Sequence, residues 1–235
     1  GVHGDLQRAS VRAGYPLILS SQQTVRAQLG FDFTDNVANV GPGPNFIAPG
    51  PTPIFNIFHD RYEDVKLAGE WDVNFPWALG GRAASALVYT HGLGGLNGTG
   101  LVPLSEPGAS PDFNKLAAEV HITQPLPENF VFAGLGRAQS SFHQPLMEAE
   151  QLQLAGPDVL SGFALGTLFV DEGAVTRGEL QRPIPLPIKG GVAIATPYVF
   201  GAWGGGRFNE NVTGLNPFVH ATSFGGGLRT NASII

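Results

Sequence analysis

Cysteine is absent from this 235-residue sequence, and charged residues make up only 14% of it. Without cysteine, the chain has no disulfide framework and no thiolate site. Average soluble domains carry about 25% charged residues, so this chain is short of charge. No apolar run approaches the roughly 18 residues that a membrane helix needs. The net charge of −6 argues against a nucleic-acid partner, because phosphate binding needs clustered Lys and Arg.

Glycine, in contrast, is abundant at 33 residues, and 43% of the chain is hydrophobic. Low charge, many glycines and aromatics, and no long apolar run are typical of outer-membrane β-barrels, in which each strand needs only one apolar face. A soluble all-β sandwich is the alternative that composition alone leaves open.

Apolar and polar residues alternate along most of the chain, which is the period-two pattern of β-strands. The clearest example is the segment 25–34, where Leu29 and Phe31 lie on one side and Arg26 and Asp32 on the other. Comparable segments are 8–17, 64–73, 83–91, 115–123, 130–140, 175–181, 192–203 and 219–235. We count about nine strands, whereas single-chain bacterial barrels have even numbers, so one strand is missed or the chain is part of a larger barrel.

Short turns, such as 187–191, alternate with long connections rich in Gly, Pro and Asn. The long connections are 36–56, 92–111, the segment after residue 140, and 204–217. This alternation places all long loops at one end of an up-and-down meander, as in outer-membrane barrels. We therefore predict an all-β, antiparallel, up-and-down transmembrane β-barrel, with residues 1–235 forming one partial barrel domain.

Charged side chains recur on the polar sides of the predicted strands. Placing one such charge in lipid at mid-bilayer costs roughly 2–4 kcal/mol, so the polar sides should surround a wet lumen. The apolar sides should then contact the lipid bilayer and lipopolysaccharide. The residues that we expect to line the lumen are Arg26, Lys66, Glu70, Arg137, Arg177 and Glu179.

Motifs for catalysis are not evident. The six histidines are scattered one to a segment without metal-ligand spacing, and no Ser-His-Asp arrangement is suggested. We expect no enzyme activity, no cofactor and no metal site.

The segment 154–166 is too irregular for a strand and too broken by Gly and Pro for a helix. A long loop with its own pattern inside a regular array of strands usually has a function. The residues that carry its pattern are Gly156, Leu160, Ser161, Gly162 and Phe163.

These residues resemble the sixth-loop signature Gly-Gly-x-x-x-[Val/Leu]-Arg-Gly-[Phe/Tyr] of the two-partner secretion transporters (TpsB) of the haemolysin-activator type, ShlB/FhaC/HecB. In that family the signature precedes Gly-Asp-x-Gly and a strand with Glu-Leu-Arg; here the matching pieces are 171–173 and 179–181. The segments 15–18 and 124–127 are similar to the family as well. The resemblance runs nearly from end to end.

The resemblance implies a bacterial outer-membrane pore that exports an unfolded partner exoprotein without ATP, with the loop folded back into the pore. It also implies a barrel of about sixteen strands. The family's earlier strands, plug helix and periplasmic polypeptide-binding (POTRA) domains are then not part of this sequence.

Two departures from the family pattern occur together. The family has an Arg at the position of Ser161, and this Arg reaches an Asp in a Phe-x-Asp-x-Gly strand motif that matches Phe200, Ala202 and Gly204 here. Losing one partner would leave a buried charge that costs about 3–5 kcal/mol, whereas losing both costs far less. The departures leave a second hypothesis open, a barrel that acts as a passive porin or structural scaffold.

Overall fold

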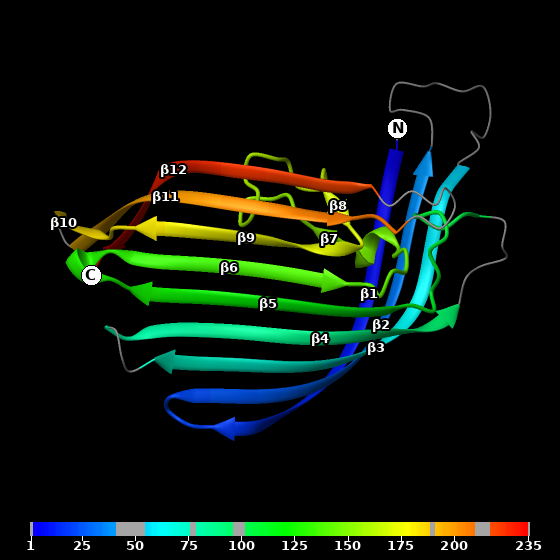
Figure 1. Ribbon diagram of the computed structural model, residues 1–235, viewed down its shortest axis with the longest axis horizontal. Helices are drawn as coiled ribbons and strands as arrows, with labels where there is room; N and C mark the ends of the chain where they lie inside the picture. The colour runs from blue at the N-terminus through cyan, green and yellow to red at the C-terminus, as the bar shows by residue number, and fades with distance from the viewer. Residues whose placement is uncertain are drawn as a thin grey trace.

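The computed structural model describes residues 2–40, 55–75, 79–95, 102–188, 191–209 and 217–234. Ten strands form one antiparallel sheet (Figure 1). They are β1 (Val2–Leu19), β2 (Gln23–Val40), β3 (Phe55–Phe75), β4 (Gly81–Gly95), β5 (Asn114–Pro125), β6 (Val131–Ser140), β9 (Glu172–Gln181), β10 (Ile184–Ile188), β11 (Gly191–Arg207) and β12 (Phe218–Ile234). The predicted all-β antiparallel meander is confirmed. Within the described ranges no helix is both long and apolar enough to cross a membrane.

Strand β10 continues the line of β9 after a short break. Both strands pair with β11, through Gln181 opposite Tyr198 and Ile184 opposite Ala195. Pro183 lies in the break between them, where its missing N–H leaves no ladder bond unmade. If β9 and β10 are counted as one interrupted strand, the sheet has nine strands, which agrees with the count from the sequence.

One face of the sheet is apolar because side chains alternate along each strand. On that face Leu29 and Leu67 are cross-strand partners, exposed by 56% and 58%. Within the described ranges the only other paired strands, β7 and β8, contact the opposite face, so no second sheet covers the apolar one. The β-sandwich alternative is therefore wrong.

The polar face is the concave one. The segment 141–171 contacts β1 through Glu150 and Arg8, and it contacts β12 through Gly162 and Ser223. A segment that reaches both edge strands lies inside the curve of the sheet. Figure 1 shows the right-hand parts of β1, β2 and β3 turning out of the plane of the other strands. The sheet is thus a partial barrel with β1 and β12 as its edges.

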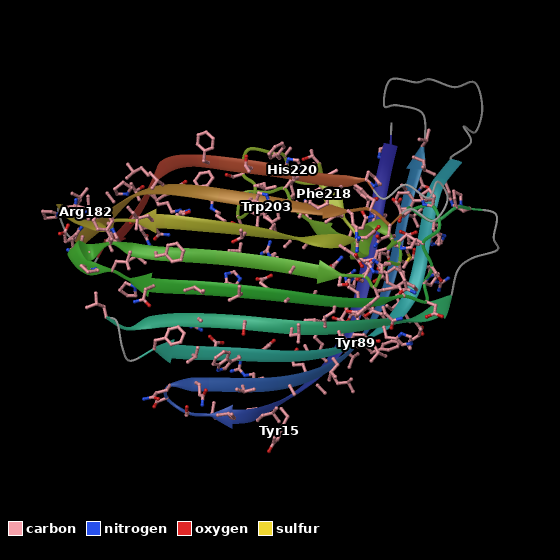
Figure 2. The ribbon with its side chains drawn as sticks, viewed as in Figure 1. Tyr15, Tyr89, Arg182, Trp203, Phe218 and His220 are labelled. Atoms are coloured by element: carbon pink, nitrogen blue, oxygen red, sulfur yellow. The ribbon has the colours of Figure 1, made fainter. Side chains whose placement is uncertain are left out.

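Aromatic side chains lie on the outer face of the sheet, near the end that carries the long connections. Trp203, Phe218 and His220 lie together there on β11 and β12 (Figure 2). Trp203 and Phe218 are exposed by 43% and 64%. Outer-membrane barrels carry aromatic girdles of this kind where the apolar band meets the membrane interface.

Several segments that the sequence predicts as loops belong to strands. Strand β2 continues through residues 36–40, because β1 pairs with it as far as Val2 opposite Val40. Strand β4 likewise continues through residues 92–95. Residues 41–54 and 96–101 of the predicted loops lie outside the described residues.

The glycine-rich start of the predicted loop 204–217 is the end of strand β11, which runs to Arg207. A Cβ atom at Gly206 would overlap the carbonyl oxygen of Glu172 on β9, so glycine permits the strands to approach closely. Residues 187 and 188 of the predicted turn belong to β10, whereas 189–190 and 210–216 lie outside the described residues.

Candidate functional site: a loop on the concave face

The connection between β6 and β9, residues 141–171, folds back along the concave face and is termed the inner loop. It contains the 3-10 helix η2 (Glu148–Glu150) and a hairpin of β7 (Leu152–Gln153) and β8 (Phe169–Val170). Figure 1 shows this hairpin beside β9, β11 and β12. Residues 155–167 form its tip. Gly156 has a φ of 143°, a backbone conformation that residues other than glycine rarely adopt.

The concave face of the sheet under the inner loop is termed the wall. Three of its residues form a row beneath the tip. In the ladder, Arg177 of β9 lies opposite Ala202 of β11, and Ala202 lies opposite Ser223 of β12. Leu160 is fully buried in a hydrophobic cluster that includes Ala202. The backbone N–H of Gly162 donates to Ser223 Oγ across 3.2 Å. Neighbouring tip residues are therefore placed on neighbouring strands.

Arg177 holds the tip through hydrogen bonds. Its Nη1 donates to two carbonyl oxygens of the tip, Pro157 at 3.1 Å and Val159 at 3.4 Å. The same atom donates to Ser161 Oγ at 3.2 Å. The guanidinium lies 3.7 Å from the centre of the Phe200 ring, in cation–π geometry. Arg177 is only 8% exposed, and charge-assisted hydrogen bonds shielded from water are stronger than exposed ones.

Glu179 balances the charge of Arg177 on the wall. Arg177 Nη2 donates to Glu179 Oε2 at 3.1 Å, and Arg229 of β12 donates to both oxygens of the same carboxylate. Gln181 Nε2 donates to Glu179 Oε1 at 2.6 Å. All of these groups belong to the sheet, and Asp158 of the inner loop adds an electrostatic interaction with Arg229.

Glu150 anchors the loop at its other end. Its carboxylate, 3% exposed, accepts from Tyr62 Oη at 2.6 Å. It also pairs with Lys115 Nζ at 2.6 Å and with Arg8 Nη2 at 3.0 Å. Its backbone carbonyl oxygen accepts from Gln139 Nε2 at 3.0 Å. One loop residue is thereby joined to β1, β3, β5 and β6.

The two buried carboxylates of the loop have opposite pKa shifts. Burial alone would raise the pKa of Glu150, but the Lys115 ammonium and the Tyr62 hydroxyl lower it below the usual value. Burial raises the pKa of Asp171, even though the backbone N–H groups of Asn209 and Leu146 donate to it. Glu150 is thus held as an anion, whereas at Asp171 burial outweighs the hydrogen bonds that the carboxylate accepts.

Two hydrophobic clusters complete the contact between loop and wall. The first joins the hairpin and tip to β9 and β11, and its buried members are Leu154, Val159, Leu160, Val170, Val175 and Ala202. The second joins the start of the loop to β3 and to the segment before β5, and its buried members are Tyr62, Phe113, Leu146 and Met147. The loop therefore has a buried apolar side against the wall and an exposed side.

The residues singled out on the loop divide between these two sides. Leu160 is buried against Val175 and Ala202 of the wall, and Gly156 is buried within the loop itself, beside Val159 and Leu165. Ser161, Gly162 and Phe163 lie on the exposed side of the tip, where Ser161 and Gly162 still make the bonds to Arg177 and Ser223.

The strand residues singled out lie directly beneath the tip. Phe200 stacks on the Arg177 guanidinium, and Ala202 packs in the cluster with Leu160. A Cβ atom at Gly204 would lie 3.1 Å from Leu160 Cδ1, so glycine leaves room for the loop.

All six charged residues expected along the lumen lie on the concave face. All six are paired within the wall: Arg26 with Glu70, Lys66 with Asp32 and Asp64, Arg137 with Glu119, and Arg177 with Glu179. Within the described residues, Arg177 is the one of the six that hydrogen-bonds to the inner loop.

Sequence reasoning missed Glu150 and Ser223. Glu150 lies 142 residues from Arg8 and 88 from Tyr62, so no local pattern connects them. The sequence did contain one signal for Glu150: it is an acidic residue in a loop, and the strands before that loop carry cations on their polar sides. Ser223 carries no such signal, because its role depends on the register of β11 and β12.

A curved antiparallel meander with an apolar outer face and a long loop inside it is the architecture of an outer-membrane transporter barrel. The family model for the haemolysin secretion/activation protein ShlB/FhaC/HecB matches residues 68–230, and the chain belongs to this family of two-partner secretion proteins. The predicted family is thereby confirmed.

The solved structure of CdiB from Escherichia coli has the same fold, with a TM-score of 0.69 and 17% sequence identity. The alignment covers 99% of this chain and 40% of the CdiB chain, so this chain spans less than half the length of CdiB. No curated protein matches the chain in sequence.

Proposed function

We propose that this chain forms part of an outer-membrane pore that exports an unfolded partner polypeptide, and that the inner loop is the movable element of this pore. The single observation that carries the proposal is the inner loop itself, which occupies the concave face from Glu150 to the tip while joined to both edge strands. A polypeptide that passes along this face must displace the tip.

The wall beneath the loop suits the passage of an extended chain. Its charges are paired side by side, as with Arg26 and Glu70 at 4.0 Å and Arg137 and Glu119 at 2.9 Å. Paired charges keep the surface wet without a strong field of either sign, so segments of different charge can slide past. This favours transport of a polypeptide over tight binding of one ion or small molecule.

The outer face supports a place in the bacterial outer membrane. Leu29, Leu67 and Val120 are partly or largely exposed on it, and a lipid bilayer with lipopolysaccharide is the surrounding that would cover them. The polar concave face then encloses the lumen.

The test is to shorten the loop in the intact protein by deleting residues 157–166, which leaves the β7–β8 pairing in place. We expect the barrel still to assemble, ion conductance in planar bilayers to rise, and export of the co-encoded exoprotein to be lost. Unchanged export would contradict the proposal.

A passive pore is the second candidate, because the tip is held by Arg177 and Ser223 without an ion pair. High conductance of the unmodified protein, insensitive to the deletion of 157–166, would favour it.

A further inference from the structure

Three positions converge where the tip meets the wall. Ser161 of the tip accepts a hydrogen bond from Arg177 of β9, and Ala202 of β11 is the ladder partner of Arg177. Positions 161 and 202 carry no charge, and the guanidinium that bonds to the tip belongs to the wall. There it pairs with Glu179, which also pairs with Arg229.

We propose that Arg177 is the positioning residue of the inner loop, with the holding cation fixed on the wall and only neutral acceptors on the loop. The guanidinium is oriented by Glu179 on one side and by the Phe200 ring on its face. It therefore points Nη1 at the tip without any help from the loop. Two carbonyl oxygens and the Ser161 hydroxyl complete the contact.

This arrangement sets how the tip leaves. When the tip moves away, Arg177 loses three neutral acceptors but keeps Glu179 and Phe200, and water can replace the lost bonds. No ion pair with Arg177 is broken at the tip, although the Asp158 carboxylate moves with the tip away from Arg229. The contact of Arg177 with the tip thus differs from the Glu150 anchor, where a carboxylate of the loop is paired with the cations Arg8 and Lys115.

A cysteine pair reports the position of the tip. A Cβ atom built at Gly162 lies 3.8 Å from Ser223 Cβ, which is the mean Cβ–Cβ distance of a disulfide. The chain has no other cysteine, so the G162C/S223C protein can form only this bond within the chain. The rate at which the disulfide forms under mild oxidation measures how often the tip lies in contact with the wall.

The variants are made in this G162C/S223C background in the intact protein, in outer membranes. R177Q should slow formation of the bond about tenfold, because hydrogen bonds from a charged donor are replaced by weaker ones. R177K should slow it less, since a lysine keeps the charge but lacks the planar fork. The matched control is R82Q, because Arg82 pairs with Asp72 at 2.7 Å on the same face, away from the loop. R82Q should leave the rate unchanged.

Moving the guanidinium from wall to loop separates a positioning role from a structural one. S161R alone places a second cation against Arg177 and should slow the bond. S161R combined with R177A returns a second guanidinium to Glu179 beside that of Arg229 and should restore most of the rate. If R177A acted only by impairing barrel assembly, the bond rate would fall in R177A and in the double variant alike. Assembly is checked by the heat-modifiable migration of the barrel.

The proposal is overturned if R177Q and R177K form the bond as fast as the parent, or if S161R fails to rescue R177A. It rests on the proposed function only for its consequence in export. If the bond rates change as expected but export of the co-encoded exoprotein does not, the positioning role stands and the export function fails.

Discussion

Arg177 and Ala202 face each other in the ladder between β9 and β11, so the cation and the small apolar residue share one place beneath the loop tip. Ala202 receives Leu160 into a hydrophobic cluster, while Arg177 binds the backbone of the same tip. The tip is thus seated by shape on one strand and by hydrogen bonds on the next. The predictions that follow separate these contributions.

The buried anchor at Glu150 should dominate the stability of the loop. E150Q keeps the shape and one acceptor for Tyr62 but leaves Lys115 and Arg8 without a carboxylate. Breaking a buried pair costs about 3–5 kcal/mol, and the partial exposure of Arg8 favours the lower end. Thermal unfolding of the barrel should therefore begin at a lower temperature. E148Q, an exposed neighbour in η2, is the control and should behave like the parent.

The same carboxylate gives a defined pH dependence. Since the folded-state pKa of Glu150 is lowered, its ionised form is favoured in the folded protein. Its stabilisation is fully present above the ordinary Glu pKa of about 4.3 and is lost as the pH falls through the lower folded-state value. The stability difference between the parent and E150Q should thus shrink below about pH 4. A difference that grows on acidification would contradict this account.

Glycine at position 204 should be needed for seating the tip. A side chain there meets Val175 Cγ2 at 3.0 Å and Leu160 Cδ1 at 3.1 Å, so G204V should push the tip off the wall at a cost of about 1–3 kcal/mol. In G201V the new side chain enters open space on the outer face of the same strand. Cross-linking of the G162C/S223C pair should fall in G204V and persist in G201V; equal yields would argue against a seated tip.

The two faces of β3 should respond differently to a new charge. L67R places a cation on the apolar outer face, where lipid contact at mid-bilayer costs roughly 2–4 kcal/mol. A68R places the same residue on the concave face, beside the paired charges of Lys66 and Glu70. Outer-membrane assembly should drop for L67R and not for A68R. Equal tolerance would show that lipid does not cover the outer face.

The strands were predictable because each has one apolar and one polar side, and this alternation survives in sequence. Their ends were not. Residues 204–207 look like a loop, since three of them are glycine, yet those glycines let β9 and β11 approach closely. Composition reports flexibility there, whereas the pairing partner decides the structure.

The loop was predictable as a feature and its attachment was not. The motif around Ser161 marked the tip, and the absent charges at 161 and 202 indicated a different attachment. That attachment uses Arg177, which the sequence identified only as a charged residue on a polar face. Register brings Arg177 beside Ala202, and register across strands depends on pairing that a single sequence does not specify.

The most direct test of the central claim, that the tip sits on the wall and must leave for export, is export by the G162C/S223C protein with and without a reductant. The account predicts that the oxidised protein, locked at the 3.8 Å Cβ separation, assembles but does not export its co-encoded exoprotein, and that reduction restores export while the single-cysteine variants export throughout. Full export by the oxidised, cross-linked protein would contradict it.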